Sequence, residues 1–276
     1  MTVDLAGFPA HLSMRGGDPR QTAEHLLHLI TDAVSNHPRS LQQRVGPSEL
    51  GHPCARRLGY KFLGKAERAG TPPNWKATVG TALHSWLEAT LDAANLDYEQ
   101  RTRSGQERFW LEQRVTVGQV AGVDVDGSCD VYDRATATVI DWKTCGPTQL
   151  TKYRRLGPGP QYRAQAHLYG RGWRARGVPV DTVMIVFLPR NGELSESYTW
   201  HEPYNESVAV AALQRADGIA LAVAALGTDA LAVLPTADAF CHLCPYFVPA
   251  ATDLARGCPG DASRPARADT TTAMIA

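Results

Sequence analysis

The order of the patterned segments predicts a mixed α/β fold, in which helices flank a central mixed sheet. Three observations lead to this prediction. A helical apolar stripe over 77–95 is followed by an alternating stretch rich in Val, Thr and Ile over 112–142. A second helical pattern over 161–176 then leads into a continuous apolar run over 183–188. The sequence therefore runs helix, three strands, helix, strand, with the terminal segments expected to pack alongside.

The first half of the chain contains two expected helices and three expected strands. Residues 20–36 should form an amphipathic helix that Pro38 ends, because apolar residues recur there at helical spacing, at Leu26, Leu27, Ile30 and Val34. The helix over 77–95 has one apolar face, formed by Val79, Leu83, Trp86, Leu87 and Leu91. Strands are expected at about 112–120, 123–132 and 137–142, with tight turns near 121–122 and 134–136.

The second half of the chain is expected to complete the sheet and to cover it. Residues 147–160 are interpreted as a loop with at most a short helical turn, because Pro and Gly recur there. The run over 183–188 should be a buried strand, and residues 198–201 could pair with it as a hairpin. Residues 205–226 should form an Ala-rich helix, whereas the small and polar tail after Gly260 should be disordered.

Composition alone indicates no particular partner. Lys and Arg total 28 and Asp and Glu also total 28, so the net charge is zero, and the hydrophobic fraction of 43% is ordinary for a globular protein. Residues 1–17 lack a signal-peptide pattern, and we expect no membrane-spanning segment. The expected location is the cytoplasm, where cysteines are reduced or bound to metal.

The basic residues are unevenly distributed. No Asp or Glu lies between positions 143 and 180, a stretch whose basic side chains are Lys143, Lys152, Arg154, Arg155, Arg163, Arg171, Arg174 and Arg176. Such a segment in a neutral chain suggests an anionic partner. A solvated face that is balanced by acids elsewhere is the alternative.

The strand that ends near residue 142 carries a possible catalytic pattern. Asp141 and Lys143 are two residues apart and share one face of a strand, whereas Ile140 and Trp142 should point the other way, into a core. If the preceding strand pairs with this one, Asp130 lies near Asp141. Two carboxylates beside a lysine suit phosphodiester hydrolysis, because Mg²⁺ or Mn²⁺ binds through a few carboxylates and the lysine stabilises the charge on phosphate. An ordinary Asp–Lys pair on a surface hairpin is the alternative.

Further polar residues flank this strand in a recognisable order. His84 follows Gly80 on the helix before it, and Gln165 and Tyr169 lie four residues apart on the helix after it. The order Gly-x-x-x-His, Gly-x-x-Asp, Asp-x-Lys, Gln-x-x-x-Tyr resembles the PD-(D/E)XK nucleases, specifically their RecB-like branch, over about residues 48–258. The resemblance implies a restriction-endonuclease-like core. It departs from the family name at one point, since no proline precedes Asp130.

The resemblance also implies roles for these residues. His84, Asp130, Asp141 and the backbone carbonyl of Trp142 would bind one or two Mg²⁺ or Mn²⁺ ions. Lys143 would be the catalytic lysine. Gln165 and Tyr169 would position that lysine and the DNA strand, completing a catalytic set of Asp130, Asp141, Lys143, Gln165 and Tyr169.

Four of the six cysteines form a second candidate site. Cys241 and Cys244 are a C-x-x-C pair, thirteen residues separate Cys244 from Cys258, and Cys54 lies near the start of the resemblance. Thiolates gathered in this way bind zinc or an iron–sulfur cluster. One early and three late cysteines resemble the AddB-like nucleases and the CRISPR-adaptation exonucleases of Cas type four, which implies a [4Fe–4S] cluster. Zn²⁺ is the alternative, with His242 as a possible ligand in place of Cys258. Cys129 and Cys145 fit better as buried apolar thiols.

These patterns together predict a metal-dependent DNA exonuclease that acts on single strands or duplex ends. Phosphate contacts and base stacking are expected from Lys152, Tyr153, Arg154, Arg155 and Arg163. A non-catalytic subunit of a recombination or CRISPR-adaptation complex, which would have protein partners, is one alternative. An endonuclease of the same fold is another.

The same reasoning divides the chain into five segments. We expect a flexible N-terminus over 1–18, a helical segment with the first cysteine over 19–76, the nuclease core over 77–226, a Cys-rich segment over 227–260 and a disordered tail over 261–276.

Overall fold

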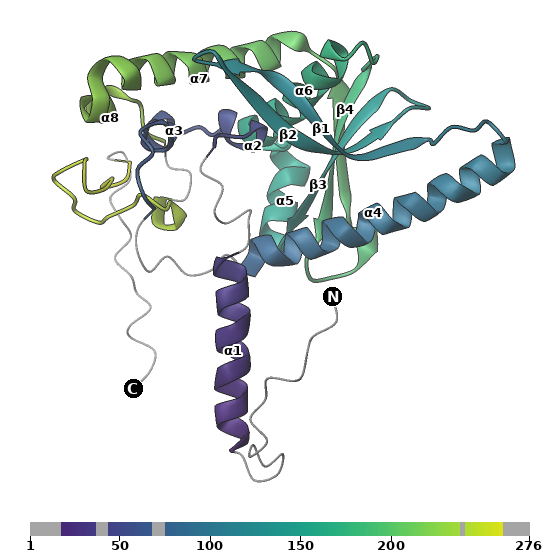
Figure 1. The fold of residues 1–276 in the computed structure, drawn as a ribbon, viewed down its shortest axis with the longest axis horizontal. Helices are drawn as coiled ribbons and strands as arrows, with labels where there is room; N and C mark the ends of the chain where they lie inside the picture. Colours follow the sequence, from purple (N-terminus) through teal and green to yellow (C-terminus); the bar gives the residue numbers. More distant parts are fainter. Residues whose placement is uncertain (1–17, 37–43, 68–74, 238–240, 262–276) are drawn as a thin grey trace, which may run out of the picture. The chain divides into compact units, whose positions relative to one another are not determined.

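A computed structural model describes residues 18–36, 44–67, 75–237 and 241–261 (Figure 1). Its helices are α1 (Pro19–Ser35), α2 (Pro47–Leu50), α3 (Ala55–Phe62), α4 (Trp75–Thr102), α5 (Pro147–Leu156), α6 (Gly159–Ala175), α7 (Glu206–Leu226) and α8 (Ala230–Val233). Its strands are β1 (Phe109–Val120), β2 (Val123–Asp133), β3 (Thr138–Cys145), β4 (Thr182–Pro189) and β5 (Tyr198–Pro203). The N-terminus up to residue 17, Pro38 and the tail from residue 262 lie outside the described residues.

The chain divides into two compact units, residues 1–42 with 72–78 and residues 43–71 with 79–276. In the first unit, α1 confirms the expected N-terminal helix. It begins after Asp18, whose carboxylate accepts a hydrogen bond from the backbone N–H of Arg20 at 2.9 Å. Pro19 occupies the first helical position, where its missing N–H costs nothing.

The second unit is built on a five-stranded sheet in the order β1-β2-β3-β4-β5. The pairs β1–β2, β2–β3 and β4–β5 are antiparallel, and β3–β4 is parallel because α5 and α6 carry the chain back across the sheet. The predicted mixed sheet is therefore confirmed, as is the β4–β5 hairpin.

Helices α6 and α7 lie on one face of this sheet (Figure 1). Helix α6 packs across it from β1 to β4, and α7 packs against both α6 and β1. Helix α2 lies against α6, while α3 lies against α7 and α8. The core between the sheet and α6 includes the fully buried side chains of Val115, Val139, Leu168, Val183 and Ile185.

Three expectations about local structure were wrong. Residues 147–156 form the ten-residue helix α5 rather than a loop. Pro147 starts this helix, and Gly157 ends it with a φ of 74°, a conformation that favours glycine. Helix α4 continues to Thr102, beyond the predicted end at residue 95. Ile140 and Trp142 are only partly buried.

The core side of β3 is the side that carries the catalytic pattern. Val139 is fully buried and Asp141 is 2% exposed. The physical reason is that α6 packs on this face and brings Gln165 to Asp141.

The stretch Glu206–Val233 is long and apolar enough to cross a membrane by length and composition, which the sequence reading did not expect. Its apolar character has a local explanation, because α7 buries one face against α3, α6 and β1.

Candidate active site

Strands β2 and β3 bring the two predicted acids together where their ladder ends. The last residues that pair are Val131 and Ile140, and the same register continued by one residue places Asp130 opposite Asp141. The backbone N–H of Trp142 donates to Asp130 Oδ2 at 2.8 Å. The Asp130 carboxylate thus takes the place of a backbone carbonyl as the acceptor for this N–H. The Asp130 and Asp141 side chains are 9% and 2% exposed. Two carboxylates thus converge in a largely buried site.

The two acids differ in how readily they ionise. Burial raises the pKa of Asp141 to about 6, and the Asp130 carboxylate adds to the rise, although Lys143 opposes it. Burial also disfavours ionised Asp130, but His84 and Lys143 outweigh it and hold the pKa of Asp130 below its usual range. Lys143 forms an ion pair with Asp141 Oδ2. At neutral pH, Asp130 is the more firmly ionised member of the pair.

His84 on α4 reaches the same site, as predicted. Its Nε2 donates to the carbonyl of Trp142 at 3.2 Å, and its Nδ1 lies 3.6 Å from Asp130 Oδ1. Burial alone would lower the pKa of His84, but the Asp130 carboxylate raises it above the ordinary value. His84 therefore adds one imidazole to the two carboxylates.

A third acid, Glu112 on β1, completes a possible metal site and was missed by the sequence reading. One ligand atom each from His84, Glu112 and Asp130 lies within 4.8 Å of the other two. One nitrogen and two carboxylate oxygens are a donor set that fits a divalent ion such as Mn²⁺ or Mg²⁺. Both His84 and the Trp142 carbonyl were predicted to serve such an ion.

The signal for Glu112 is concealed by a bulge in β1. At the turn between β1 and β2, Val120 pairs with Val123. If this register continued along the two strands, residue 112 would lie opposite Val131. The register shifts by one residue between Thr116 and Gly118, which brings Glu112 opposite Asp130 instead. A glycine at position 118, with a φ of 152°, is the only hint of that bulge in the sequence.

Helix α6 supplies the next layer of the site, again as predicted. Gln165 Nε2 donates to Asp141 Oδ1 at 2.9 Å and fixes the orientation of that carboxylate. Tyr169 is buried one turn later, and burial together with the charges of Asp141 and Asp130 raises its pKa well above the ordinary value. Gly127 leaves room for this packing, since a Cβ there would lie 2.7 Å from Pro47 Cγ and 3.1 Å from Tyr169 Cε1.

An aromatic pair beside Lys143 was not anticipated. The Lys143 ammonium lies 5.1 Å from the ring centre of Tyr162, which is on α6 one turn before Gln165. The Tyr162 ring is 6.0 Å from that of Tyr153 on α5, and Tyr153 stacks on Phe187 at 4.3 Å. Lys143 is therefore held between a carboxylate and an aromatic ring, and α5 is brought close to the site.

The structure places the five predicted DNA-binding side chains unequally. Lys152, Arg154 and Arg155 are exposed on α5, with Arg154 donating to the carbonyl of Glu196. Tyr153 is partly buried against Phe187. Arg163 donates to Glu202 at 2.6 Å, so its charge is compensated. The exposed basic residues of α5 are the better placed for phosphate contacts.

The four predicted metal-binding cysteines line one pocket, together with Arg57, Tyr60, Tyr246, Phe247 and a few other residues. His242 is not among the lining residues, whereas Cys258 is. Cys258 is joined to the C-x-x-C segment by the hydrogen bond that its N–H donates to Tyr246 O at 2.8 Å. Tyr60 of α3 stacks on Tyr246 at 4.9 Å and donates to Leu254 O at 2.7 Å, which brings Cys54 beside the other three.

The remaining two cysteines behave as expected of apolar thiols. Cys129 is fully buried and Cys145 is 6% exposed. Burial raises the pKa of both thiols, most strongly that of Cys129. Neither belongs to the cysteine pocket.

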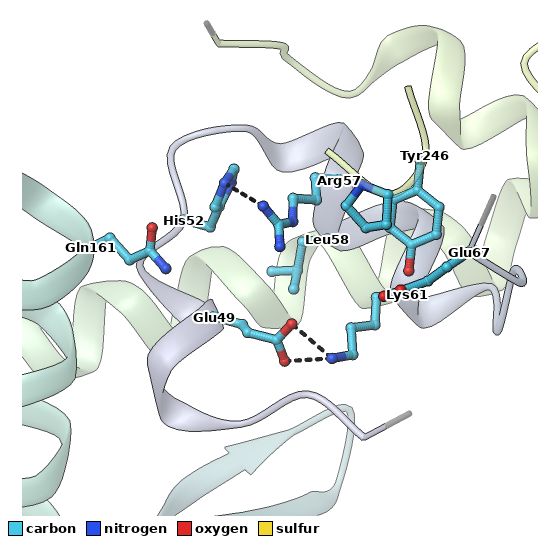
Figure 2. Close-up of a pocket in the computed structure, with 9 residues that line it drawn as sticks. Glu49, His52, Arg57, Leu58, Lys61, Glu67, Gln161 and Tyr246 are labelled. Carbon is cyan, nitrogen blue, oxygen red and sulfur yellow. Dashed lines mark hydrogen bonds and ion pairs between the residues drawn. The ribbon is translucent and has the colours of Figure 1, made fainter. Parts of the chain in front are cut away.

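A second, polar pocket lies next to the cysteine pocket and shares Arg57 and Tyr246 with it (Figure 2). Lys61 donates to Glu49 at 2.7 Å in this pocket, and Arg57 Nη1 lies 3.2 Å from His52 Nε2. Burial, assisted by Arg57, lowers the pKa of His52 to about 4, so His52 is neutral at pH 7.

This polar pocket also contains Gln161 of α6, which donates to Ser48 O at 2.7 Å. These contacts tie the segment that carries Cys54 to the helix that carries Gln165. The segment that carries Cys54 therefore lies beside helix α6.

A sequence profile of the PD-(D/E)XK nuclease superfamily matches residues 65–247. Comparison with curated proteins gives no significant match.

Several solved structures are similar to the chain. An alkaline exonuclease from Laribacter hongkongensis is 14% identical over 67% of this chain and 93% of its own, with a TM-score of 0.35. The same exonuclease in complex with dAMP is 14% identical over 68% and 93%, with a TM-score of 0.34. A phage-related exonuclease from Haemophilus somnus 129PT is 13% identical over 64% and 91%, with a TM-score of 0.33.

The family profile covers well over half of the chain and includes every residue of the active-site cluster, from His84 to Tyr169. The chain belongs to the PD-(D/E)XK nuclease superfamily.

Proposed function

We propose that this nuclease is a Mg²⁺- or Mn²⁺-dependent deoxyribonuclease that acts as an exonuclease on single strands or duplex ends. The observation that carries the proposal is the burial of Asp130 and Asp141 at the parting of β2 and β3, with Lys143 paired to Asp141. The buried Asp141 carboxylate opposes folding when it ionises, because burial raises its pKa. A cation bound at the acid pair would offset that cost.

The residues of the site divide the work of hydrolysis. A divalent ion held by Asp130, Asp141, His84 and the Trp142 carbonyl would activate a water and offset the charge on the phosphate. Lys143, held by Asp141 and Tyr162, is placed to stabilise negative charge that develops on a phosphate oxygen. Gln165 keeps Asp141 in one orientation, and Tyr169 lies buried one turn later on the same face of α6.

DNA is the proposed substrate, and α5 is the proposed guide for the strand. Lys152, Arg154 and Arg155 are exposed on this helix, and its Tyr153 packs through Tyr162 toward Lys143. Basic side chains beside a cation site would hold the phosphates that flank the scissile one.

The test is cleavage of end-labelled linear DNA, single- and double-stranded, with Mn²⁺ or with EDTA. We expect cleavage by the wild type that EDTA and Asp141→Ala each abolish, and the release of mononucleotides or short products from ends. Cleavage of circular single strands would indicate an endonuclease. If the protein binds DNA but cleaves none of these substrates in the presence of metal, the proposed catalytic function is wrong and a non-catalytic binding subunit is favoured.

We also propose that Cys54, Cys241, Cys244 and Cys258 hold a [4Fe–4S] cluster in the cytoplasm, as in the AddB-like and CRISPR-adaptation branch. Their lining of one pocket supports a shared ligand. The arrangement of one early and three late cysteines, with a C-x-x-C pair among the late ones, is the pattern that favours a cluster over zinc in this proposal.

The cluster is tested by iron and sulfide analysis and visible absorbance after anaerobic purification. We expect iron in the wild type and in the matched control Cys145→Ser, and its loss in Cys54→Ser and Cys258→Ser. Zinc in place of iron would favour the alternative metal. Iron that survives both substitutions would refute the ligand assignment.

A further inference from the structure

Strands β3 and β4 run parallel, so their carboxyl ends meet at one edge of the sheet. Lys143 lies two residues before the end of β3. Arg190 is the first residue beyond β4, whose last residue pairs with the last residue of β3. Ligands of open α/β sheets bind outside the carboxyl ends of parallel strands. Arg190 therefore occupies the edge at which a ligand of Lys143 would lie.

Two hydrogen bonds hold Arg190 against β3. Its backbone N–H donates to the carbonyl of Cys145 at 2.8 Å, and its Nη2 donates to the carbonyl of Thr144 at 3.3 Å. Thr144 directly follows Lys143, so this guanidinium lies beside the neighbour of the predicted catalytic lysine. Burial raises the pKa of the Cys145 thiol, and the positive charges of Arg190 and of Arg154 on α5 oppose the rise because both lie near it.

The charge of Arg190 is not compensated. This side chain is exposed, and in the described part of the chain no carboxylate forms an ion pair with it. In the turn that follows, the Glu196 carboxylate accepts from the backbone N–H of Glu193 at 2.9 Å instead. Arg163, by contrast, is paired with Glu202 at 2.6 Å. The Arg190 fork of N–H donors, whose shape matches a phosphate, is thus largely available to a ligand.

We propose that Arg190 binds a phosphate group of the DNA strand beside the scissile phosphate, and so determines the affinity for DNA rather than the rate of cleavage. This inference rests on the proposed nuclease function and names a substrate contact outside the acid pair. The charge pattern of the sequence did not indicate it, because Arg190 lies beyond the acid-free segment 143–180. The parallel pairing of β3 and β4 brings it to the site.

The experiment compares DNA binding and cleavage by the wild type, Arg190→Gln and Arg190→Lys. Binding of a short fluorescent single strand is measured by anisotropy in EDTA over a range of salt concentrations, and KM and kcat are measured in Mn²⁺. Thermal unfolding establishes that each variant is folded. The matched control is Arg101→Gln, which removes the same charge from an exposed arginine about 25 Å along α4 from His84.

We expect Arg190→Gln to weaken DNA binding by about tenfold or more at low salt, the equivalent of one charge-assisted hydrogen bond. The salt dependence of the binding constant should become shallower by about 0.7 on a double logarithmic scale, because one phosphate contact is lost. KM should rise and kcat should stay unchanged. Arg190→Lys should keep the salt dependence and lose part of the affinity, since it keeps the charge without the fork. Arg101→Gln should behave as the wild type does.

The outcomes separate this inference from the function on which it rests. Arg190→Gln with the affinity and salt dependence of the wild type, or with a lowered kcat at an unchanged KM, would refute the role of Arg190 and leave the nuclease function intact. A wild type that cleaves no DNA, but whose binding shows the expected loss in Arg190→Gln, would support the phosphate contact and refute the nuclease. A wild type that binds no DNA refutes both.

Discussion

Replacing Asp141 with Asn should stabilise the metal-free protein, although it destroys the proposed active site. Asp141 is 2% exposed, and burial raises its pKa from 3.8 to about 6. Between these two values the folded state holds a proton that the unfolded chain has released, so the free energy of unfolding falls as pH rises through this interval. Asn resembles the protonated acid at every pH and escapes this loss.

The size of the effect follows from the shift. A difference of about two pKa units corresponds to about 3 kcal/mol at 1.36 kcal/mol per unit. The advantage of Asp141→Asn should therefore grow from under about 1 kcal/mol at pH 4 to about 3 kcal/mol at pH 8. Saturating Mn²⁺ should reverse the order, because a ligand that binds only the folded wild type stabilises it.

The assay is urea unfolding of both proteins in EDTA across that pH range, repeated with Mn²⁺. Asp133→Asn is the matched control of opposite sign. Burial of Asp133 is outweighed by its bonds to Arg108 and Thr136, which lower its pKa, so this variant should lose stability, and lose more at pH 7 than at pH 3. An Asp141→Asn variant less stable than wild type at pH 8 in EDTA would refute the reasoning.

Three further predictions concern the surroundings of the acid pair. Gly127→Ala should lower the free energy of unfolding by about 1–3 kcal/mol in urea titrations, since its Cβ would meet Pro47 at 2.7 Å; an unchanged midpoint would contradict this. Tyr162→Leu should slow DNA cleavage between about twofold and thirtyfold, the equivalent of about 0.5–2 kcal/mol for a lost cation–π contact to Lys143, while Tyr162→Phe should cleave normally. Mn²⁺ affinity, measured by calorimetry, should fall from pH 7 to pH 5, because protons compete for Asp141 and His84, whose pKa values are both raised; affinity independent of pH would argue against these ligands.

Much of the fold was predictable because its elements have a strong periodicity. Strand β4 is a continuous apolar run, and α6 and α7 have apolar faces at helical spacing, so burial alone determines their type. The proximity of Asp130 and Asp141 was predictable because the short turn between β2 and β3 sets the register of the two strands.

What was missed depends on features without periodicity. The one-residue bulge before Gly118 decides that Glu112 faces Asp130, and a bulge leaves almost no trace in an alternating strand. Helix α5 was read as a loop because proline and glycine at its ends outweighed its short interior. Trp142 was assigned to the core because it is large and apolar, whereas Asp141 lies on the side that α6 covers.

The central claim is that Asp130, Asp141 and Lys143 form the catalytic centre of a DNA nuclease, and Lys143→Ala tests it most directly. Single-turnover cleavage of end-labelled DNA should be measured in Mn²⁺ beside DNA binding. We predict that Lys143→Ala binds DNA within about threefold of wild type and cleaves it at least about a hundredfold more slowly, the usual cost of losing a charge-stabilising group. Cleavage by Lys143→Ala at the wild-type rate would contradict it.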